Sequence, residues 1–174
     1  MGDSAPRTIA EVVAEAIVRI SPETGITTDF TNVFNELIML IEMLPDWPEA
    51  LDETPDWQPF DYVAHFEASD YVDKHLIIEA WHLAAAHRRV ALGAMFDAAN
   101  ALIAAGLDPL RDPATRNLHD AAELATALRS LVVAMTAVVN GGTGSSAQSA
   151  VDDLFGDETS GEAMSAADID ALFD

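Results

Sequence analysis

"LHDAAELATALRSLVVAMTAVV", at Leu118–Val139, is the stretch that decides the fold class. Apolar residues recur in it at about every third or fourth position, the spacing that places them on one face of an α-helix. The pattern stops at "NGG", a sequence typical of a helix end. The members of the stripe are Leu118, Ala122, Ala125, Leu128, Val132, Met135 and Val139. The stretch therefore predicts an amphipathic helix that buries one face in a helical core.

The residues before this stretch predict more helix. From Asp70 to Ala105 the sequence is typical of one long helix, or of two with a bend, because its alanine-rich middle has high helix propensity. Asp70 is suited to cap its start and Gly106 to end it. Asp112 followed by Pro113 then predicts the start of the next helix, since proline is favoured at the first helical position.

Two shorter helical patterns lie nearer the N-terminus. The first runs from Ile9 to Ile20 and ends at "SPETG", and the second runs from Phe30 to Leu44 and is stopped by Pro45. No segment shows strand alternation bounded by hairpin turns. We therefore predict an all-α fold, an antiparallel bundle of about four helices formed by residues 1–140.

A Trp/Pro-rich segment, "LPDWPEALDETPDWQPFDY", separates the second pattern from the third and contains "PDW" twice. One interpretation is a connector whose indoles pack on the bundle. The other is an exposed aromatic docking surface.

The amino-acid composition argues against some classes of function. The 174 residues carry 30 acidic and 8 basic side chains, a formal net charge of −22, and no cysteine. We expect no nucleic-acid partner, because no basic surface is available to neutralise phosphates. We also expect no membrane insertion, because no unbroken apolar run is long enough to span a bilayer. The N-terminus lacks a signal-peptide pattern, so a cytoplasmic protein is predicted.

The composition changes after Asn140. Residues 141–174 begin "GGTGSS" and contain eight acidic residues and no basic one, which predicts a flexible linker and a disordered acidic tail. Two short apolar triplets recur within this tail, each at i, i+3 and i+4, and each too short to form a stable helix alone. Each is expected to become helical in the groove of a partner. They are Val151, Leu154 and Phe155, and Ile169, Leu172 and Phe173.

The two triplets resemble a known binding peptide. "SAADIDALF" is similar to the peptide by which flagellar-motor switch proteins of the FliM type, and more loosely the phosphatase CheZ, bind the response regulator CheY. The family pattern is roughly Ser-Gln-x-acid-Ile-Asp-x-Leu-Leu/Phe. The downstream copy matches it with Ser165, Asp168, Ile169, Asp170, Leu172 and Phe173, with Ala166 in place of Gln. The upstream copy matches it with Gln148, Val151, Asp152, Leu154 and Phe155.

This resemblance implies a CheY-like response regulator as partner and a role in chemotaxis or motility. Ser165 and Asp168 also have capping-box spacing, so the local sequence favours a helix that starts at Ser165, where the peptide pattern begins. The protein would need no cofactor of its own, since Mg²⁺ would belong to the regulator. The alternative interpretation is that both segments are amphipathic helices that fold back on the bundle.

A response-regulator partner raises the question of a phosphatase activity. Phosphatases of the CheZ type use an acid followed four residues later by Gln, but neither Gln58 nor Gln148 follows an acidic residue by four positions. The CheC and CheX type uses Glu-x-x-Asn, and two pairs here have this spacing with the shorter acid: Asp97 with Asn100, and Asp29 with Asn32. Asp97 and Asn100 are the candidate catalytic residues. A non-catalytic adaptor, or a phosphate sink, remains the alternative, and a homodimer is compatible with either.

Histidines suggest two further alternatives. His87 in "HRRVALG" resembles the His-x-x-Lys-Gly of histidine phosphotransfer bundles, with Val90 and Ala91 in place of Lys and Gly. Arg88 or Arg89 would then have to supply the charge of the lysine. On the preceding turns, His75, Glu79 and His82 share one helical face. Di-iron bundles need Glu-x-x-His twice, however, and the sequence supplies it once, so no metal site is predicted.

Overall fold

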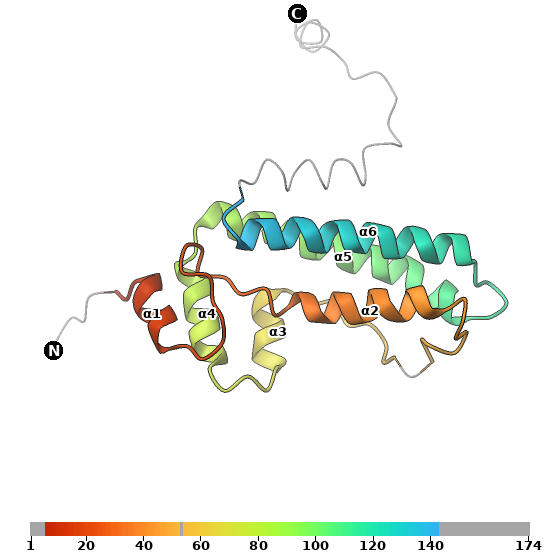
Figure 1. Ribbon diagram of the computed structural model, residues 1–174, viewed down its shortest axis with the longest axis horizontal. Coiled ribbons are helices and arrows are strands. Elements are labelled where there is room, and N and C mark those ends of the chain that lie inside the picture. The colour runs from red at the N-terminus through yellow and green to blue at the C-terminus, as the bar shows by residue number, and fades with distance from the viewer. Residues whose placement is uncertain (1–5, 53, 143–174) are drawn as a thin grey trace, which may run out of the picture.

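A computed structural model describes residues 6–52 and 54–142 of the chain, and within them the fold is all-α with six helices and no strand (Figure 1). The all-α prediction is therefore confirmed, with more helices than the expected four or so. Their bounds are α1 Ile9–Glu15, α2 Thr31–Met43, α3 Tyr62–Ala68, α4 Lys74–Leu83, α5 Ala86–Arg111 and α6 Leu118–Val139.

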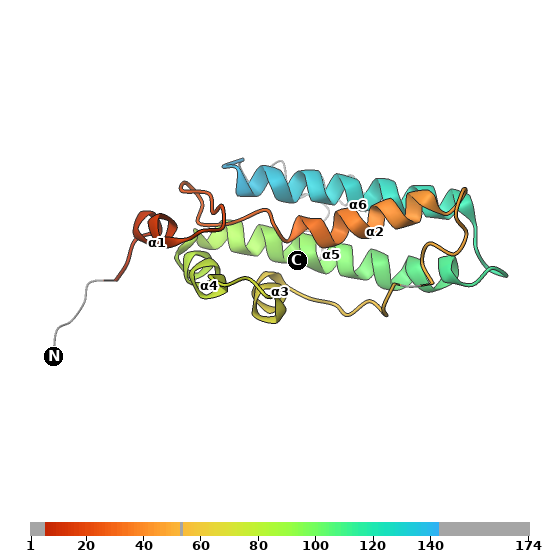
Figure 2. The ribbon, with the colours of Figure 1, turned by 60° about the horizontal axis from the view of Figure 1, so that its bottom comes forward.

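Three long helices, α2, α5 and α6, form the body of the molecule. They lie side by side in both ribbon views, with α6 antiparallel to α5 and to α2 (Figures 1 and 2). The amphipathic stripe of the sequence explains this packing, because its residues supply the buried face of α6. Most of that stripe is buried, including Leu128, Val132 and Met135.

The three short helices gather at one end of this body, where α4 contacts both α1 and α3 (Figure 1). An aromatic chain joins them to the long helices. Tyr62 of α3 stacks on Trp81 of α4 at a centroid distance of 4.3 Å and meets Phe30 edge-on at 5.6 Å. Phe30 in turn lies 5.0 Å from Phe96 of α5. The short helices and the long ones therefore share one hydrophobic core.

Several predicted helix boundaries are wrong. Of the two alternatives for Asp70–Ala105, the structure has the second, two helices separated by extended backbone at Ala84 and Ala85, but the first begins at Lys74 and Asp70 does not cap it. Gly106 does not end the second, which continues through Pro109 to Arg111. A Cβ at Gly106 would lie 2.9 Å from Leu124 Cδ2, so this glycine serves the close approach of α5 and α6.

Asp112 does not begin α6, although Pro113 follows it. Its carboxylate instead accepts the Ala114 N–H at 2.8 Å within the turn between α5 and α6. The cap of α6 is Asn117, whose side chain accepts the His119 N–H at 2.9 Å. The first helix is also shorter than predicted, because it ends at Glu15.

The "NGG" stop is confirmed in detail. Gly141 has φ +93°, the left-handed region that favours glycine, and its N–H bonds to the Val138 carbonyl at 3.4 Å. The Gly142 N–H bonds to the Ala137 carbonyl at 2.8 Å. These two reversed bonds are the Schellman arrangement that closes a helix.

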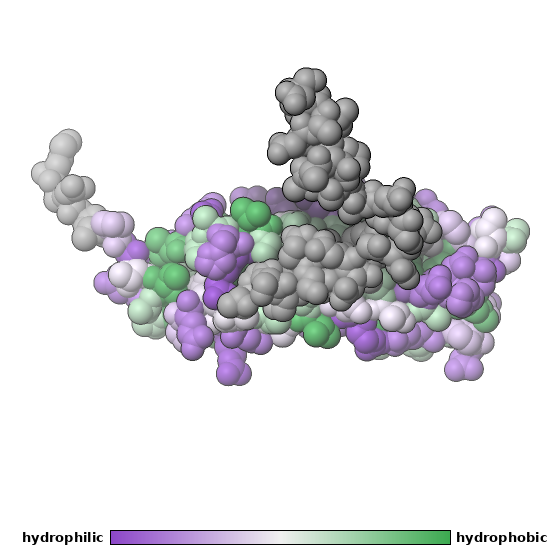
Figure 3. Space-filling model, turned by 90° about the horizontal axis from the view of Figure 1, so that it is seen from above, coloured by the Kyte–Doolittle hydropathy of each residue, from purple (hydrophilic) through white to green (hydrophobic). Residues whose placement is uncertain are grey.

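In the part of the chain that the structure describes, two helices, α5 and α6, are long and apolar enough to cross a membrane by length and composition alone, with a mean hydropathy of 1.6 over 18 residues of each. Core helices of soluble proteins share these properties. Here the apolar faces of both helices belong to the common core. On the face seen in Figure 3, the visible apolar residues form small separate patches among polar ones.

Candidate functional site

The predicted acid-amide pair lies on α5, but its two side chains have different surroundings. Asp97 is exposed, whereas Asn100 is only 9% exposed. The Asn100 Oδ1 accepts the indole N–H of Trp57 at 3.0 Å, and its Nδ2 donates to the Phe60 carbonyl at 2.9 Å. Both ends of this amide are therefore engaged with the segment that crosses α5.

A buried amide on the apolar face of a helix needs hydrogen-bond partners, and these two bonds supply them. The connector interpretation of the Trp/Pro-rich segment is confirmed for Trp57, whose ring packs 5.9 Å from that of Phe34 and 5.5 Å from that of Phe60. To orient a water molecule for hydrolysis, the Asn100 amide would have to exchange these partners for the substrate.

The second pair, Asp29 and Asn32, lies where α2 begins. Asn32 is exposed and Asp29 is half-buried. Burial raises the pKa of the nearby Tyr71 phenol, and the Asp29 carboxylate adds to that rise. Burial lowers the pKa of His65, against the opposing effect of Asp29. The lowered pKa makes the His65 imidazole less available as a positive group for a phosphoryl oxygen.

His87 is exposed in the first turn of α5, but the arginine beside it is engaged elsewhere. The Arg88 guanidinium donates to the Val138 carbonyl at 2.8 Å, to the Gly142 carbonyl at 3.0 Å and to the Gly141 carbonyl at 3.4 Å. It thus binds the C-terminal end of α6, where unpaired carbonyls and the helix dipole favour a cation. Arg88 is therefore occupied as a helix-end ligand and not as a phosphate ligand.

The three residues with metal-ligand spacing on α4 do not form a cluster. Glu79 accepts a hydrogen bond from Arg7 at 3.0 Å, while His75 and His82 are exposed. In residues 6–52 and 54–142, no group of three or more His, Cys, Asp or Glu side chains is arranged to hold a metal ion. The carboxylate of Glu79 is engaged in the ion pair with Arg7.

The predicted partner-binding residues lie outside the described part of the chain. They are Val151, Asp152, Leu154, Phe155, Ser165, Asp168, Ile169, Asp170, Leu172 and Phe173. The described part of the chain ends just after α6. The last turn of α6 is held by Arg88 and by Thr24, whose Oγ1 donates to the Val139 carbonyl at 2.7 Å.

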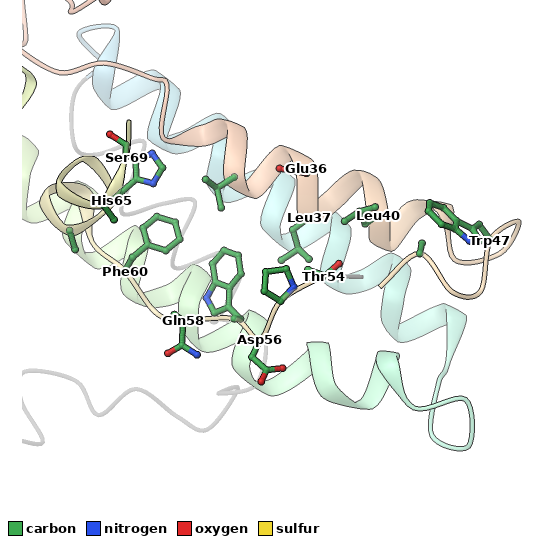
Figure 4. Close-up of a pocket in the computed structure, with 16 residues that line it drawn as sticks. Glu36, Leu37, Leu40, Trp47, Thr54, Asp56, Gln58, Phe60, His65 and Ser69 are labelled. Carbon is green, nitrogen blue, oxygen red and sulfur yellow. The ribbon is translucent and has the colours of Figure 1, made fainter. Parts of the chain in front are cut away.

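A groove that the sequence analysis did not predict lies between α2 and the segment 47–69. Its volume is about 820 Å³ and its walls are mainly apolar. Leu37 and Leu40 lie along α2, with Phe60 and His65 toward one end and Trp47 toward the other (Figure 4). The spacing of Met39, Met43 and Trp47, at i, i+4 and i+8, signals an exposed apolar stripe beside the groove, because it continues one helical face past the end of α2.

No family model, no curated protein and no solved structure matches this chain.

Proposed function

We propose that this protein is an adaptor that binds a CheY-type response regulator through the two apolar-acidic segments of its tail, without cleaving the aspartyl phosphate. The observation that carries the proposal is the repeated Ile/Val-Asp-x-Leu-Phe pattern at Val151–Phe155 and Ile169–Phe173. Each copy offers one apolar face flanked by carboxylates, the form that suits a helix laid in a groove. The setting would be chemotaxis or motility control in the cytoplasm.

The surroundings of Asn100 favour the adaptor over the phosphatase. Hydrolysis of an acyl phosphate depends on positioning of the attacking water, and the positioning group must face the substrate. The Asn100 amide faces Trp57 and the Phe60 carbonyl instead. Releasing it would leave two part-buried polar groups without a partner, at a cost of roughly 1–1.5 kcal/mol for each.

The end of α6, from which the tail continues, is held firmly enough to serve as the attachment point of a tether. The last turn of α6 is bound by Arg88 from α5 and by Thr24 from the loop before α2. A regulator held by the tail would therefore remain close to a fixed point on the bundle. Such tethering raises the effective concentration of the bound partner at that surface.

The test is binding of the full chain to CheY-type regulators in their unphosphorylated and phosphorylated forms, measured by calorimetry. We expect tighter binding of the phosphorylated form. Phe173→Ala removes the largest apolar anchor of the downstream copy and should cost on the order of 2 kcal/mol. Met164→Ala, an apolar residue of the same tail outside the triplets, is the matched control. Equal affinities for wild type and Phe173→Ala would contradict the proposal.

The phosphatase is the second candidate, favoured by the spacing of Asp97 and Asn100 on α5. It requires that the protein accelerate the loss of phosphate from the regulator. Asp97→Ala is the better probe of this activity, because Asp97 is exposed and its removal leaves the Asn100 hydrogen bonds in place. Our proposal predicts no acceleration under conditions where the regulator binds. Acceleration that Asp97→Ala abolishes would establish the phosphatase instead.

A further inference from the structure

The groove between α2 and the segment 47–69 has a preformed wall. Trp57 and Phe60 are held in place by the two hydrogen bonds of Asn100, and the Phe60 ring stacks on Phe34 at 5.4 Å. A ligand that enters this groove meets side chains that are already ordered. Little conformational entropy would be lost on that side, which favours binding.

Exposed apolar side chains extend the groove along the outside of α2. Met39 is 52% exposed, Met43 is 38% exposed and Trp47 is 42% exposed. Met39 and Met43 lie one turn apart on α2, and the Trp47 N–H bonds to the Met43 carbonyl at 2.7 Å, so the chain keeps a helix-like course to Trp47. Together the three cover about 12 Å along the helix axis, or two turns.

This stripe adjoins the groove on the helix surface, because Leu40 and Glu36 lie three or four residues from its members. Methionines and a tryptophan are the side chains that adaptable protein-binding surfaces use most, since thioethers fit varied shapes and indoles supply large contact areas. Exposed stripe and apolar groove thus form one surface, which we call the methionine groove (Val33, Glu36, Leu37, Met39, Leu40, Met43, Trp47, Trp57 and Phe60).

The charge around the methionine groove is negative and uncompensated. Glu36 lines it, and Asp46, Glu49 and Asp52 lie within five residues of Trp47 in the sequence, all of them exposed. None of these four carboxylates belongs to an ion pair formed within the described ranges. The nearby Arg111 is bound to Asp56 at 2.9 Å and to the Thr54 and Pro55 carbonyls. A positively charged partner is therefore favoured.

The same charges disfavour the tail of this chain as the occupant. Residues 141–174 carry eight acidic side chains and no basic one, so an apolar triplet entering the groove would bring like charges to Glu36 and Asp46. A peptide added as an extra strand would need a sheet edge, and the described part of the chain contains no strand. A helix laid along α2 would reach the whole stripe.

We propose that the methionine groove is a docking site for an amphipathic helix with a basic face, supplied by another protein. One large apolar side chain of that helix enters between Leu37 and Phe60, and its neighbours cover Met39, Met43 and Trp47. Its lysines or arginines pair with Glu36, Asp46 and Glu49. This surface is separate from the tail, so the protein would hold two partners by different means.

The test uses the full chain and a fluorescein-labelled synthetic peptide of about 18 residues, five helical turns, with leucines on one face and lysines on the other. Fluorescence anisotropy should show binding, and a counterpart with glutamates in place of the lysines should not bind. Trp47→Ala should weaken binding by about tenfold or more, because it removes a large exposed aromatic contact. Glu36→Lys should also weaken binding and reduce its dependence on salt.

Two matched controls locate the effect. Val133→Ala removes an exposed apolar residue of α6, and Glu123→Lys reverses an exposed charge of α6. Both should leave the affinity within about twofold of wild type, because surface changes away from a contact have small effects. All four substitutions are at exposed positions, and circular dichroism should confirm an unchanged helix content.

Three results would overturn the proposal. Equal weakening by Glu123→Lys and Glu36→Lys would mean that the peptide binds the acidic surface diffusely. Tighter peptide binding after replacement of Leu154, Phe155, Leu172 and Phe173 by alanine would make the tail the occupant. A dimer of the wild-type chain that Trp47→Ala dissociates in sedimentation experiments would make a second copy the occupant.

Discussion

The indole N–H of Trp57 donates to Oδ1 of Asn100 across 43 positions of the chain, at 3.0 Å. The same amide donates from its Nδ2 to the Phe60 carbonyl at 2.9 Å. One side chain of α5 thus fixes both ends of the four-residue segment that forms a wall of the methionine groove. The residue that best matched a catalytic pattern in the sequence is also the one that joins the connector to the bundle.

Asn100→Leu should therefore destabilise the fold. The substitution replaces the amide by an apolar side chain of similar size and leaves the Trp57 N–H and the Phe60 carbonyl without their partner, at a cost of roughly 2–3 kcal/mol. Urea unfolding followed by circular dichroism measures this loss. Asp97→Leu, three residues earlier and exposed, should change the free energy of unfolding by less than about 0.5 kcal/mol. Similar losses in both variants would show that the two hydrogen bonds add nothing to stability.

Arg88→Lys should loosen the end of α6. A lysine has one ammonium in place of the planar guanidinium fork, so it cannot reach the Val138, Gly141 and Gly142 carbonyls together. We expect faster hydrogen exchange for the amides of the last turn of α6 and a loss of about 1–2 kcal/mol in the free energy of unfolding. Arg129→Lys, in an exposed ion pair with Glu42, is the control and should have almost no effect. Unchanged exchange in Arg88→Lys would contradict the assigned role.

Asp73 should make the stability of the protein depend on pH at the acid end. Burial acts to raise the pKa of this carboxyl, but the backbone N–H groups of Val18 and Ile17, at 3.0 and 2.6 Å, together outweigh it and lower the pKa. The charged carboxylate therefore stabilises the fold at pH values above the unfolded-state pKa of about 3.9. That stabilisation is lost as the pH falls through the lower pKa of the folded state.

Asp73→Asn is the variant that measures this effect. At pH 7 it should unfold about 2 kcal/mol more easily than wild type, because hydrogen bonds to a charged group are lost. The difference between the two proteins should shrink as the pH falls below 4. Urea unfolding of both proteins at a series of pH values gives the comparison, and a difference independent of pH down to 2 would refute it.

The two tail copies should act as alternative sites for one regulator. Nine residues, 156–164, separate Phe155 from Ser165, and an unstructured spacer of that length spans about 17 Å on average. A compact domain of regulator size is wider, roughly 30 Å across. Calorimetry on the full chain should then give close to one regulator per chain. A stoichiometry of two with equal affinities would show that the spacer permits both.

The downstream copy should be the stronger of the two, because it keeps the Ser165 and Asp168 capping box, whereas Ala150 replaces the acid upstream. Replacing Leu172 and Phe173 by alanine should weaken regulator binding more than replacing Leu154 and Phe155. The ratio of the two dissociation constants measures the difference, and the reverse order would contradict it.

Periodicity predicted the long helices well and the boundaries less well. The stripe from Phe30 to Leu44 matches α2 within a residue at each end. The break at Ala84 and Ala85 has no local signal, because alanine favours helix. It arises from tertiary packing, since α4 contacts α1 and α3 while α5 contacts α6. Helix α3 was missed because its seven residues bury only Tyr62 and Phe66, too few to show a period.

Rules based on local sequence also misassigned the roles of Gly106 and Asn100. Gly106 is typical of a helix end, but its missing Cβ instead makes room for Leu124 of the neighbouring helix. Asn100 and Asp97 have a catalytic spacing, but no sequence pattern shows that a tryptophan 43 positions away occupies the amide. Such pairings depend on which segments the fold brings together, and spacing along one helix carries no information about them.

The guanidinium of Arg88 also decides how the bundle would respond to force. A partner that pulls on the chain beyond Gly142 pulls first on the Val138, Gly141 and Gly142 carbonyls, which Arg88 holds from α5. The load is therefore shared between two antiparallel helices and acts on several hydrogen bonds at once. Without that link, α6 would unwind from its last turn one bond at a time. The arginine makes the end of α6 an anchor that can carry a tethered load.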